Sequence, residues 1–160
     1  MDSIRLRPIG VAHTPHKTMA GTPIQPKAAQ GVEGTLEIFP EYEMGLKDLD
    51  GFSHIIVLFY LHLASETKLE VIPYMDTTKK GVFATRAPVR PNHIGLSVLD
   101  LVGISGGFLQ VRNVDLVDGS PILDIKPYVP NFDEFPDNPR FGWLEENVQK
   151  LPSTKADERF

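Results

Sequence analysis

The stretch GVFATRAPVRPNHIGLSVLDL, residues 81–101, decides how the rest of the chain is interpreted. Short, β-branched and aromatic residues fill 81–85, and a longer apolar run fills 94–101, so each end predicts a β-strand. Between them, Pro88 and Pro91 restrict their own φ angles and disfavour helix at the residues that precede them. The sequence therefore predicts a stiff, extended loop between two strands.

This loop carries two arginines, Arg86 and Arg90, and no acidic residue occurs from 77 to 99. Loops that strands hold rigidly are common places for binding groups. A guanidinium suits a carboxylate or a phosphate because it forms paired hydrogen bonds with their oxygens. The alternative without a binding role is that both arginines are solvated or form ion pairs with acidic residues on the surface. The stiff, acid-free surroundings favour an anion-binding loop.

Length and composition restrict the classes of protein to which this chain can belong. The chain has 160 residues, no cysteine and a formal net charge of −5. One domain is expected at this length, and the lack of cysteine excludes disulfides, thiolate zinc sites and cysteine nucleophiles. The first residues do not form a signal peptide, and the longest apolar stretch, 55–63, is too short to cross a bilayer. We therefore expect a cytoplasmic protein with no membrane contact.

Charge is unevenly distributed along the chain. Residues 3–32 and 77–99 contain basic residues and no acids, whereas acids collect between 33 and 76 and again from 115 onward. The negative net charge argues against indiscriminate binding to nucleic acid. If the fold brings the two basic stretches together, however, they would form one positive face on an acidic protein.

Short strand patterns separated by turns dominate the chain. The strand at 53–64 is apolar on both faces, which predicts a central strand covered on both sides. A short helix is expected at 41–50 and a C-terminal helix at 139–150. We predict a mainly antiparallel β-barrel or curled sheet over 1–138, followed by a helix and tail over 139–160. The expected strands cover residues 4–14, 34–39, 53–64, 69–74, 81–85, 94–101, 108–117 and 122–129.

Few residues point to a specific chemistry by themselves. No dinucleotide or phosphate-binding loop, GxSxG or HExxH motif occurs. His13 and His16 have no carboxylate nearby in the sequence, which favours hydrogen bonding at a strand end over a metal site. His62 ends the apolar strand, where a site could open. The turn DGSP, residues 118–121, offers a carboxylate, a hydroxyl and backbone N–H groups, although the residues alone favour a well-formed turn with no further role.

Four stretches, in order along the chain, resemble the TsaA-like, TrmO-type family: RPIGVAHTPHK, FSHIIVLFYLH, GVFATRAPVRPNHIGLSVLDL and VDLVDGSPILDIKPYVP. The similarity covers residues 4–129. It implies a small, single-sheeted antiparallel β-barrel that forms a homodimer and binds S-adenosylmethionine. Characterised members methylate N6 of the threonylcarbamoyl-modified adenosine beside the tRNA anticodon.

The resemblance also implies which residues bind the cofactor. Arg86 would hold the methionine carboxylate or a backbone phosphate, Asp118 would hold an ammonium or ribose hydroxyls, and Leu63 with Leu96 would flank the adenine. The full cofactor set is Gln25, Pro26, Lys27, His62, Leu63, Arg86, Leu96, Asp118, Gly119, Ser120 and Pro121. Candidates for RNA contact are Lys79, Lys80, Arg90 and Asn92. No catalytic base is identified.

The resulting hypothesis is an S-adenosylmethionine-dependent tRNA adenine N6-methyltransferase. The alternatives are a non-catalytic S-adenosylmethionine-binding module or accessory subunit, and methyl transfer to another small acceptor. A positive groove that joins the two basic stretches would favour the enzyme. Two departures from the family pattern occur. His93 stands where a second proline is usual, and the second domain of many bacterial members is absent from these residues, which would weaken tRNA binding or require a partner.

Overall fold

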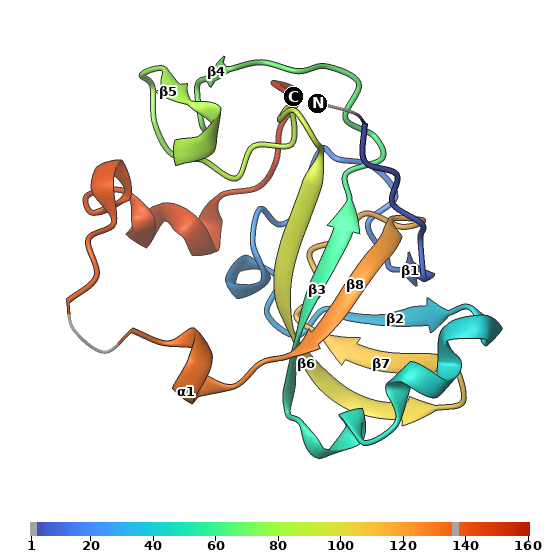
Figure 1. The fold of residues 1–160 in the computed structure, drawn as a ribbon. Coiled ribbons are helices and arrows are strands. Elements are labelled where there is room, and N and C mark those ends of the chain that lie inside the picture. Colours follow the sequence, from blue (N-terminus) through green and yellow to red (C-terminus); the bar gives the residue numbers. More distant parts are fainter. Residues whose placement is uncertain (1–2, 136–137) are drawn as a thin grey trace.

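The computed structural model describes residues 3–135 and 138–160 of a mainly β protein (Figure 1). Strands close into one antiparallel barrel in the order β1-β2-β7-β6-β3-β8. This confirms the predicted single-sheeted antiparallel barrel. The barrel strands are β1 (Gly10–His13), β2 (Glu33–Ile38), β3 (His54–Tyr60), β6 (Ile94–Ser105), β7 (Phe108–Arg112) and β8 (Pro121–Pro127).

Alternation along the strands fills the inside of the barrel. In β3, Ile55, Val57 and Phe59 point inward and are buried, while the residues between them face outward. Leu36 and Leu99 meet them from β2 and β6 in one apolar core. The outward faces of β3 and β6 stay partly open, since Tyr60 is 39% exposed and Leu96 is 45% exposed. The expectation that β3 is covered on both sides is therefore not met among the described residues of a single chain.

Residues 61–93 leave the barrel and form a small separate lobe. Its two strands, β4 (Glu70–Val71) and β5 (Lys80–Gly81), are much shorter than the strands predicted at 69–74 and 81–85. The second prediction is wrong beyond Gly81, because the chain turns into the 3-10 helix η4 (Val82–Ala84). This turn buries Val82 in a small apolar cluster outside the barrel, whose buried members are Val71, Val82, Ala87 and Val89.

Other strand boundaries also differ from the prediction. Strand β1 begins only at Gly10, two residues after Pro8, which has no N–H to donate to a ladder. Strand β6 continues to Ser105, because residues beyond Leu101 pair with β7. Strand β7 stops at Arg112, since Asn113 adopts a positive φ of 63°. The following segment carries two buried residues, Val114 and Leu116, without belonging to the sheet.

The helices are short and mostly of the 3-10 type. The helix expected at 41–50 is split into η2 (Pro40–Leu46) and η3 (Leu49–Gly51), because Asp48 has a positive φ of 66°. The first long loop contains η1 (Pro26–Ala28), and α1 (Pro130–Asp133) follows β8. Within residues 3–135 and 138–160, no helix has the length and apolar character needed to span a membrane.

The C-terminal segment differs most from its prediction. The single helix predicted at 139–150 is wrong: η5 (Gly142–Leu144) and η6 (Val148–Ser153) replace it, and Gly142 has a positive φ of 57°. Residues 151–160 do not hang free as a tail. Lys155 pairs with Pro23 in a β-bridge, and Phe160 packs on the small cluster of the lobe. Figure 1 shows this segment running alongside the barrel and ending near β4 and β5.

Candidate functional site

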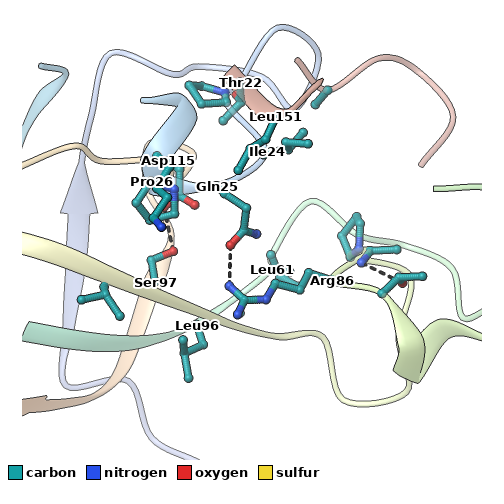
Figure 2. A pocket seen from close by; sticks show the side chains of 18 of the residues that line it. Thr22, Ile24, Gln25, Pro26, Leu61, Arg86, Leu96, Ser97, Asp115 and Leu151 are labelled. Carbon is teal, nitrogen blue, oxygen red and sulfur yellow. Dashed lines mark hydrogen bonds between the residues drawn. The ribbon is translucent and has the colours of Figure 1, made fainter. Parts of the chain in front are cut away.

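A groove of about 1810 Å³ lies between the barrel and the C-terminal segment. Its walls come from the first long loop, the end of β3, the loop after η4, strand β6, the segment after Asn113 and the residues around η6. Figure 2 shows the end of this groove where Gln25, Arg86, Ser97 and Asp115 come together beside Leu61 and Leu151. Segments far apart in the sequence therefore share one wall.

Two stiff loops place Gln25 and Arg86 in contact. Gln25 precedes Pro26, which begins η1, and the backbone N–H of Ala28 donates to the carbonyl of Gln25 at 2.9 Å. Arg86 follows η4 and donates from Nη1 to Oε1 of Gln25. The arginine thereby keeps a defined direction although its side chain is exposed.

Arg90 stiffens the loop that carries Arg86. Its Nη1 donates to the carbonyl of Thr85 at 3.2 Å and to the carbonyl of Ala87 at 3.4 Å. These two carbonyls flank Arg86 in the sequence. Arg90 also lines the groove, so its assignment as an RNA contact competes with a role in holding its own loop.

His62 and Ser120 form a second group in the groove wall. His62 directly follows the apolar run of β3, and its Nδ1 lies 3.4 Å from Oγ of the buried Ser120. This contact is long for a hydrogen bond, so it leaves the imidazole available to another partner. Exposed Leu63 and partly buried Leu61 give this part of the groove an apolar surface.

Asp115 is the acid that faces the groove near Arg86. Oγ of Ser97 donates to Oδ1 of Asp115 at 2.7 Å, and Asp115 keeps part of its surface open to the groove. Burial raises the pKa of Asp115 to about 7, although the Ser97 hydrogen bond and the positive charge of Arg86 oppose the rise. A carboxyl group that titrates near neutral pH is suited to proton transfer.

Asp118 is held by contacts within the chain and does not line the groove. Its Oδ1 accepts from the backbone N–H of Thr14 at 2.9 Å, and its Oδ2 lies 2.8 Å from Nζ of Lys17. Hydrogen bonds from Lys17 and Thr14 lower the pKa of Asp118. The lining of the groove includes Ser120 but not Asp118, Gly119 or Pro121. The turn is therefore held beside the groove by contacts within the chain.

Most of the cofactor residues implied by the family resemblance do line this groove. Leu96 and Ser97 point to opposite sides of β6, as successive strand residues must, so Leu96 faces away from Asp115 (Figure 2). The lining members of the implied set are Gln25, Pro26, Lys27, His62, Leu63, Arg86, Leu96 and Ser120.

Sequence reasoning missed the pair of Ser97 and Asp115. Both are polar residues inside apolar runs, and Ser97 occupies an inward position of β6 with 1% exposure. A polar residue at a core position needs a hydrogen-bond partner, and that rule was the signal available in the sequence.

The remaining candidates for RNA contact spread over the small lobe. Lys79 and Asn92 are exposed, while Lys80 lies 3.1 Å from the carboxylate of Asp76. The groove itself joins the two basic stretches of the sequence, because Lys27 from the first and Arg86 with Arg90 from the second all line it. Acids also line it, so the groove carries mixed charge with a basic end.

The histidines at the end of β1 form hydrogen bonds within the fold. Strand pairing sets His13 opposite Thr35, and Glu37, two residues along β2, reaches to 2.7 Å from Nε2 of His13. Nε2 of His16 lies 3.0 Å from the carbonyl of Val114. In the part of the chain that the structure describes, no three His, Asp or Glu side chains are grouped as a metal site requires.

The comparisons with known proteins agree with one another. Residues 11–134 match the model of the tRNA-methyltransferase O N-terminal domain. A probable S-adenosyl-L-methionine-binding protein of Pyrococcus abyssi is 54% identical over 154 residues, which are 96% of this chain and 83% of that protein. The tRNA (adenine(37)-N6)-methyltransferase of Mus musculus is 38% identical over 134 residues, 79% of this chain and 31% of the mouse protein.

Solved structures agree with the sequence matches. The crystal structure of TrmO from Pseudomonas aeruginosa superposes with a TM-score of 0.74 at 39% sequence identity. The match covers 89% of this chain but 63% of the solved chain. This chain thus spans less than two thirds of that protein and about a third of the mouse relative.

Proposed function

Because the chain belongs to the tRNA-methyltransferase O family, we propose that it transfers a methyl group from S-adenosylmethionine to N6 of the threonylcarbamoyl-modified adenosine at tRNA position 37. The observation that carries the proposal is the meeting of Gln25, Arg86 and Asp115 in one groove lined by both basic stretches. A tRNA substrate implies a cytoplasmic enzyme.

The residues of the groove suit the proposed cofactor. Within the described part of the chain, Gln25 accepts from one N–H of Arg86, and the rest of the guanidinium is left to bind the cofactor's carboxylate. Leu61 and Leu63 offer apolar surface for the adenine, and His62 offers a ring nitrogen for a polar group. The groove is open along its length, so a flipped nucleoside could approach the cofactor from the solvent side.

The protein's part in the reaction is mainly positioning. When bound, S-adenosylmethionine supplies a methyl group on a positively charged sulfur, which is a good leaving group. Arg86 and Gln25 would fix one end of the cofactor, and the apolar residues after β3 would exclude water from the other. Holding two reactants in a productive geometry accounts for a large share of the barrier that enzymes remove.

Recognition of tRNA would use the basic side of the groove and the small lobe. Lys27 and Arg90 line the groove, and Lys79 with Asn92 are exposed on the lobe beyond it. Lys80 is a weaker candidate because it pairs with Asp76. Phosphate contacts of this kind position the substrate without reading its sequence.

A non-catalytic S-adenosylmethionine-binding module is the second candidate. The name of the Pyrococcus abyssi relative favours it, since that protein is described only as a probable S-adenosyl-L-methionine-binding protein. A carboxyl group poised near neutral pH inside the groove favours the enzyme instead, because binding alone does not require one.

We also propose that the protein is a homodimer whose copies cover the open outer face of β3 and β6. That face carries Tyr60, Ile94 and Leu96, which are 39%, 38% and 45% exposed. On the adjacent strand β8, Lys126 already pairs with Asp124 of the same chain at 2.7 Å, so apolar contact between the two copies would supply most of the association. Light scattering should give twice the mass of the chain, and Tyr60→Glu should give the monomer. A wild-type monomer at micromolar concentration would overturn the dimer.

The function is tested first by calorimetric titration with S-adenosylmethionine, in the wild type and in Arg86→Ala. Arg112→Ala is the matched control, because Arg112 lies in β7 and pairs loosely with Glu33 at 3.6 Å. We expect the wild type and the control to bind with equal affinity, and Arg86→Ala to bind about 10-fold to 100-fold more weakly.

Methyl transfer is then measured from labelled S-adenosylmethionine to tRNA with and without the threonylcarbamoyl group. Transfer only to the modified tRNA supports the proposed enzyme. Cofactor binding without transfer to either RNA supports the binding module. Absence of cofactor binding in a folded wild type would reject both functions.

A further inference from the structure

Ser97 and Asp115 form a polar pair for which the described fold gives no structural reason. Ser97 is 1% exposed on the inward face of β6, and its Oγ donates to Oδ1 of Asp115 at 2.7 Å. Asp115 belongs to a segment anchored on either side by buried Val114 and Leu116. The carboxylate is thus held by its neighbours while part of it faces the groove.

The surroundings of this carboxylate are basic on the side of the groove. Arg86 is the charged residue whose field acts on Asp115 and favours its ionised form. Lys27 of η1, His62 after β3 and Arg86 after η4 line the same groove, and His16 lies beside Val114, whereas Asp100 shares the outward side of β6 with Leu96 and pairs with His54 at 3.2 Å. Asp100 accepts a hydrogen bond from Asn113 at 3.1 Å, so it has a partner of its own.

The chemistry of the proposed substrate calls for a proton acceptor at this place. A threonylcarbamoyl group draws the lone pair of N6 into its carbonyl by the resonance that planarises any amide. N6 is therefore a poor nucleophile, and its proton becomes strongly acidic as the new bond to carbon forms. A carboxylate within reach would remove that proton as the methyl group arrives.

We propose, given the proposed function, that Asp115 accepts the N6 proton of the substrate adenosine and that Ser97 positions its carboxylate. The lone pair of N6 forms the N–CH₃ bond while the S–CH₃ bond breaks and its electron pair stays on sulfur. The N6–H bond then yields its proton to Asp115. The products are a neutral thioether, a neutral N6-methyl group and a carboxylic acid that later returns the proton to water.

The electrostatics of the groove match each stage of this step. Burial raises the pKa of the Asp115 carboxyl to about 7 against the opposing Ser97 hydrogen bond and Arg86 charge, so both the acid and the carboxylate are populated at neutral pH. Positive charge brought into the groove favours the carboxylate, which is the form that accepts a proton. Loss of that charge on methyl transfer favours the acid, so uptake of the proton accompanies the reaction.

The inference is tested with two variants and one control. Asp115→Asn keeps the shape of the side chain but cannot accept a proton, and Ser97→Ala removes the hydrogen bond that lowers the pKa of Asp115. Asp50→Asn, at an exposed site in η3, is the control. For each protein, cofactor affinity is measured by calorimetry and single-turnover methyl transfer is measured between pH 5.5 and 8.5.

For the wild type we expect a rate that rises with pH and levels off above neutrality. Asp115→Asn should bind the cofactor yet lose about 100-fold to 10,000-fold in rate, together with the pH-dependent rise. Ser97→Ala should shift the midpoint of the rise to higher pH and keep most of the maximal rate, which a merely structural role would not do. The control should behave as the wild type.

The outcomes separate this inference from the function on which it rests. A wild type that binds no cofactor or transfers no methyl group fails the proposed function. A wild type that methylates tRNA, with an unchanged rate in Asp115→Asn, overturns the inference alone. If Asp115→Asn does not fold, the test uses the pH midpoint of the methyl-transfer rate in Ser97→Ala. A midpoint equal to that of the wild type overturns the proposal.

Discussion

The guanidinium of Arg86 donates a hydrogen bond from Nη1 to Oε1 of Gln25, a residue 61 positions earlier in the sequence. This bond joins the loop before η1 to the loop after η4 at one end of the groove (Figure 2). Both loops contain proline and both are fastened by their own hydrogen bonds, so the pair is held with little freedom. Arg86 is thereby oriented before any ligand binds.

Removing either partner should weaken cofactor binding by different amounts. Arg86→Ala deletes the group that holds the carboxylate, and a hydrogen bond to a charged group is worth about 1.5–3 kcal/mol. We therefore expect a loss of about 10-fold to 100-fold in affinity. Gln25→Ala leaves the guanidinium in place but frees its direction, so its loss should be smaller, about 3-fold to 10-fold. Calorimetry at constant salt measures both, and equal affinities in the wild type and Gln25→Ala would contradict the orienting role.

Asp115 should make the stability of the folded chain depend on pH. Burial raises its pKa from 3.8 to about 7, so the folded state holds a proton that the unfolded state has released within this window. Since the folded state binds more protons, the contribution of Asp115 to stability falls as pH rises from about 4 to about 7. Below that window the carboxyl is protonated in both the folded and the unfolded state. Above it the folded state bears the full free-energy cost of ionising the buried carboxyl.

Asp115→Asn removes this penalty and should therefore stabilise the protein more at pH 8 than at pH 5. One pKa unit corresponds to about 1.4 kcal/mol, and partial exposure to the groove reduces the effect, so the gain should grow by about 2 kcal/mol between the two pH values. Urea unfolding of both proteins at each pH measures it. A gain independent of pH would mean that Asp115 is ionised in the folded state throughout this range.

Much of the barrel could be predicted because its strands alternate clearly. The strand predicted at 53–64 contains β3, whose alternate residues Ile55, Val57 and Phe59 are buried on one face. Strand ends were less predictable. Residues 82–84 are β-branched and aromatic yet form a 3-10 turn, since Val82 is drawn into the small cluster of the lobe. That cluster includes Val71 and Phe160, which lie outside the segment itself, so local propensity could not indicate it.

The candidate site was likewise predictable only in part. Arg86 and Gln25 were expected in the site and meet in the groove, whereas Asp118 was expected there and instead binds Thr14 and Lys17. The acid that lines the groove near Arg86 is three residues earlier, at Asp115. The sequence identifies which side chains can bind an anion or a cation. Tertiary packing decides which face of a short irregular segment lies toward the groove, and the sequence does not show that packing.

Gly95 should resist substitution for a steric reason. A Cβ added there would stand 2.5 Å from Cε2 of Phe59, whose ring is buried in the barrel. Overpacking of this kind costs about 1–3 kcal/mol. Gly95→Ala should therefore lower the free energy of unfolding by that amount. Gly103→Ala in the same strand is the matched control, because a Cβ there meets nothing within 4 Å. Equal stability of the two variants would show that Phe59 moves aside without cost.

Phe160 should control the mobility of the loop that carries Arg86. Its ring lies edge-on against Tyr74, with centroids 5.1 Å apart, and it packs on the cluster that contains Val82, Ala87 and Val89. Arg159 supports the same contact, with its Cζ 5.1 Å from the centre of the Tyr74 ring. Burial, with the charge of Asp157, raises the pKa of Tyr74 to about 12, as expected for a phenol covered by the C-terminal residues.

Phe160→Ala should uncover this cluster and loosen the loop from Val82 to Arg90 without unfolding the barrel. An aromatic pair contributes about 0.5–1.5 kcal/mol, so amide hydrogens of the loop should exchange about 2-fold to 10-fold faster. Peptides from β3 serve as the internal reference, and exposed Phe141→Ala serves as the matched variant. Cofactor affinity should fall several-fold in Phe160→Ala only, because Arg86 then loses part of its fixed direction. If exchange in the loop stays at the wild-type rate, Phe160 covers the lobe but does not hold Arg86, and the rigidity of the loop then rests on its other contacts, such as those of Arg90 with Thr85 and Ala87.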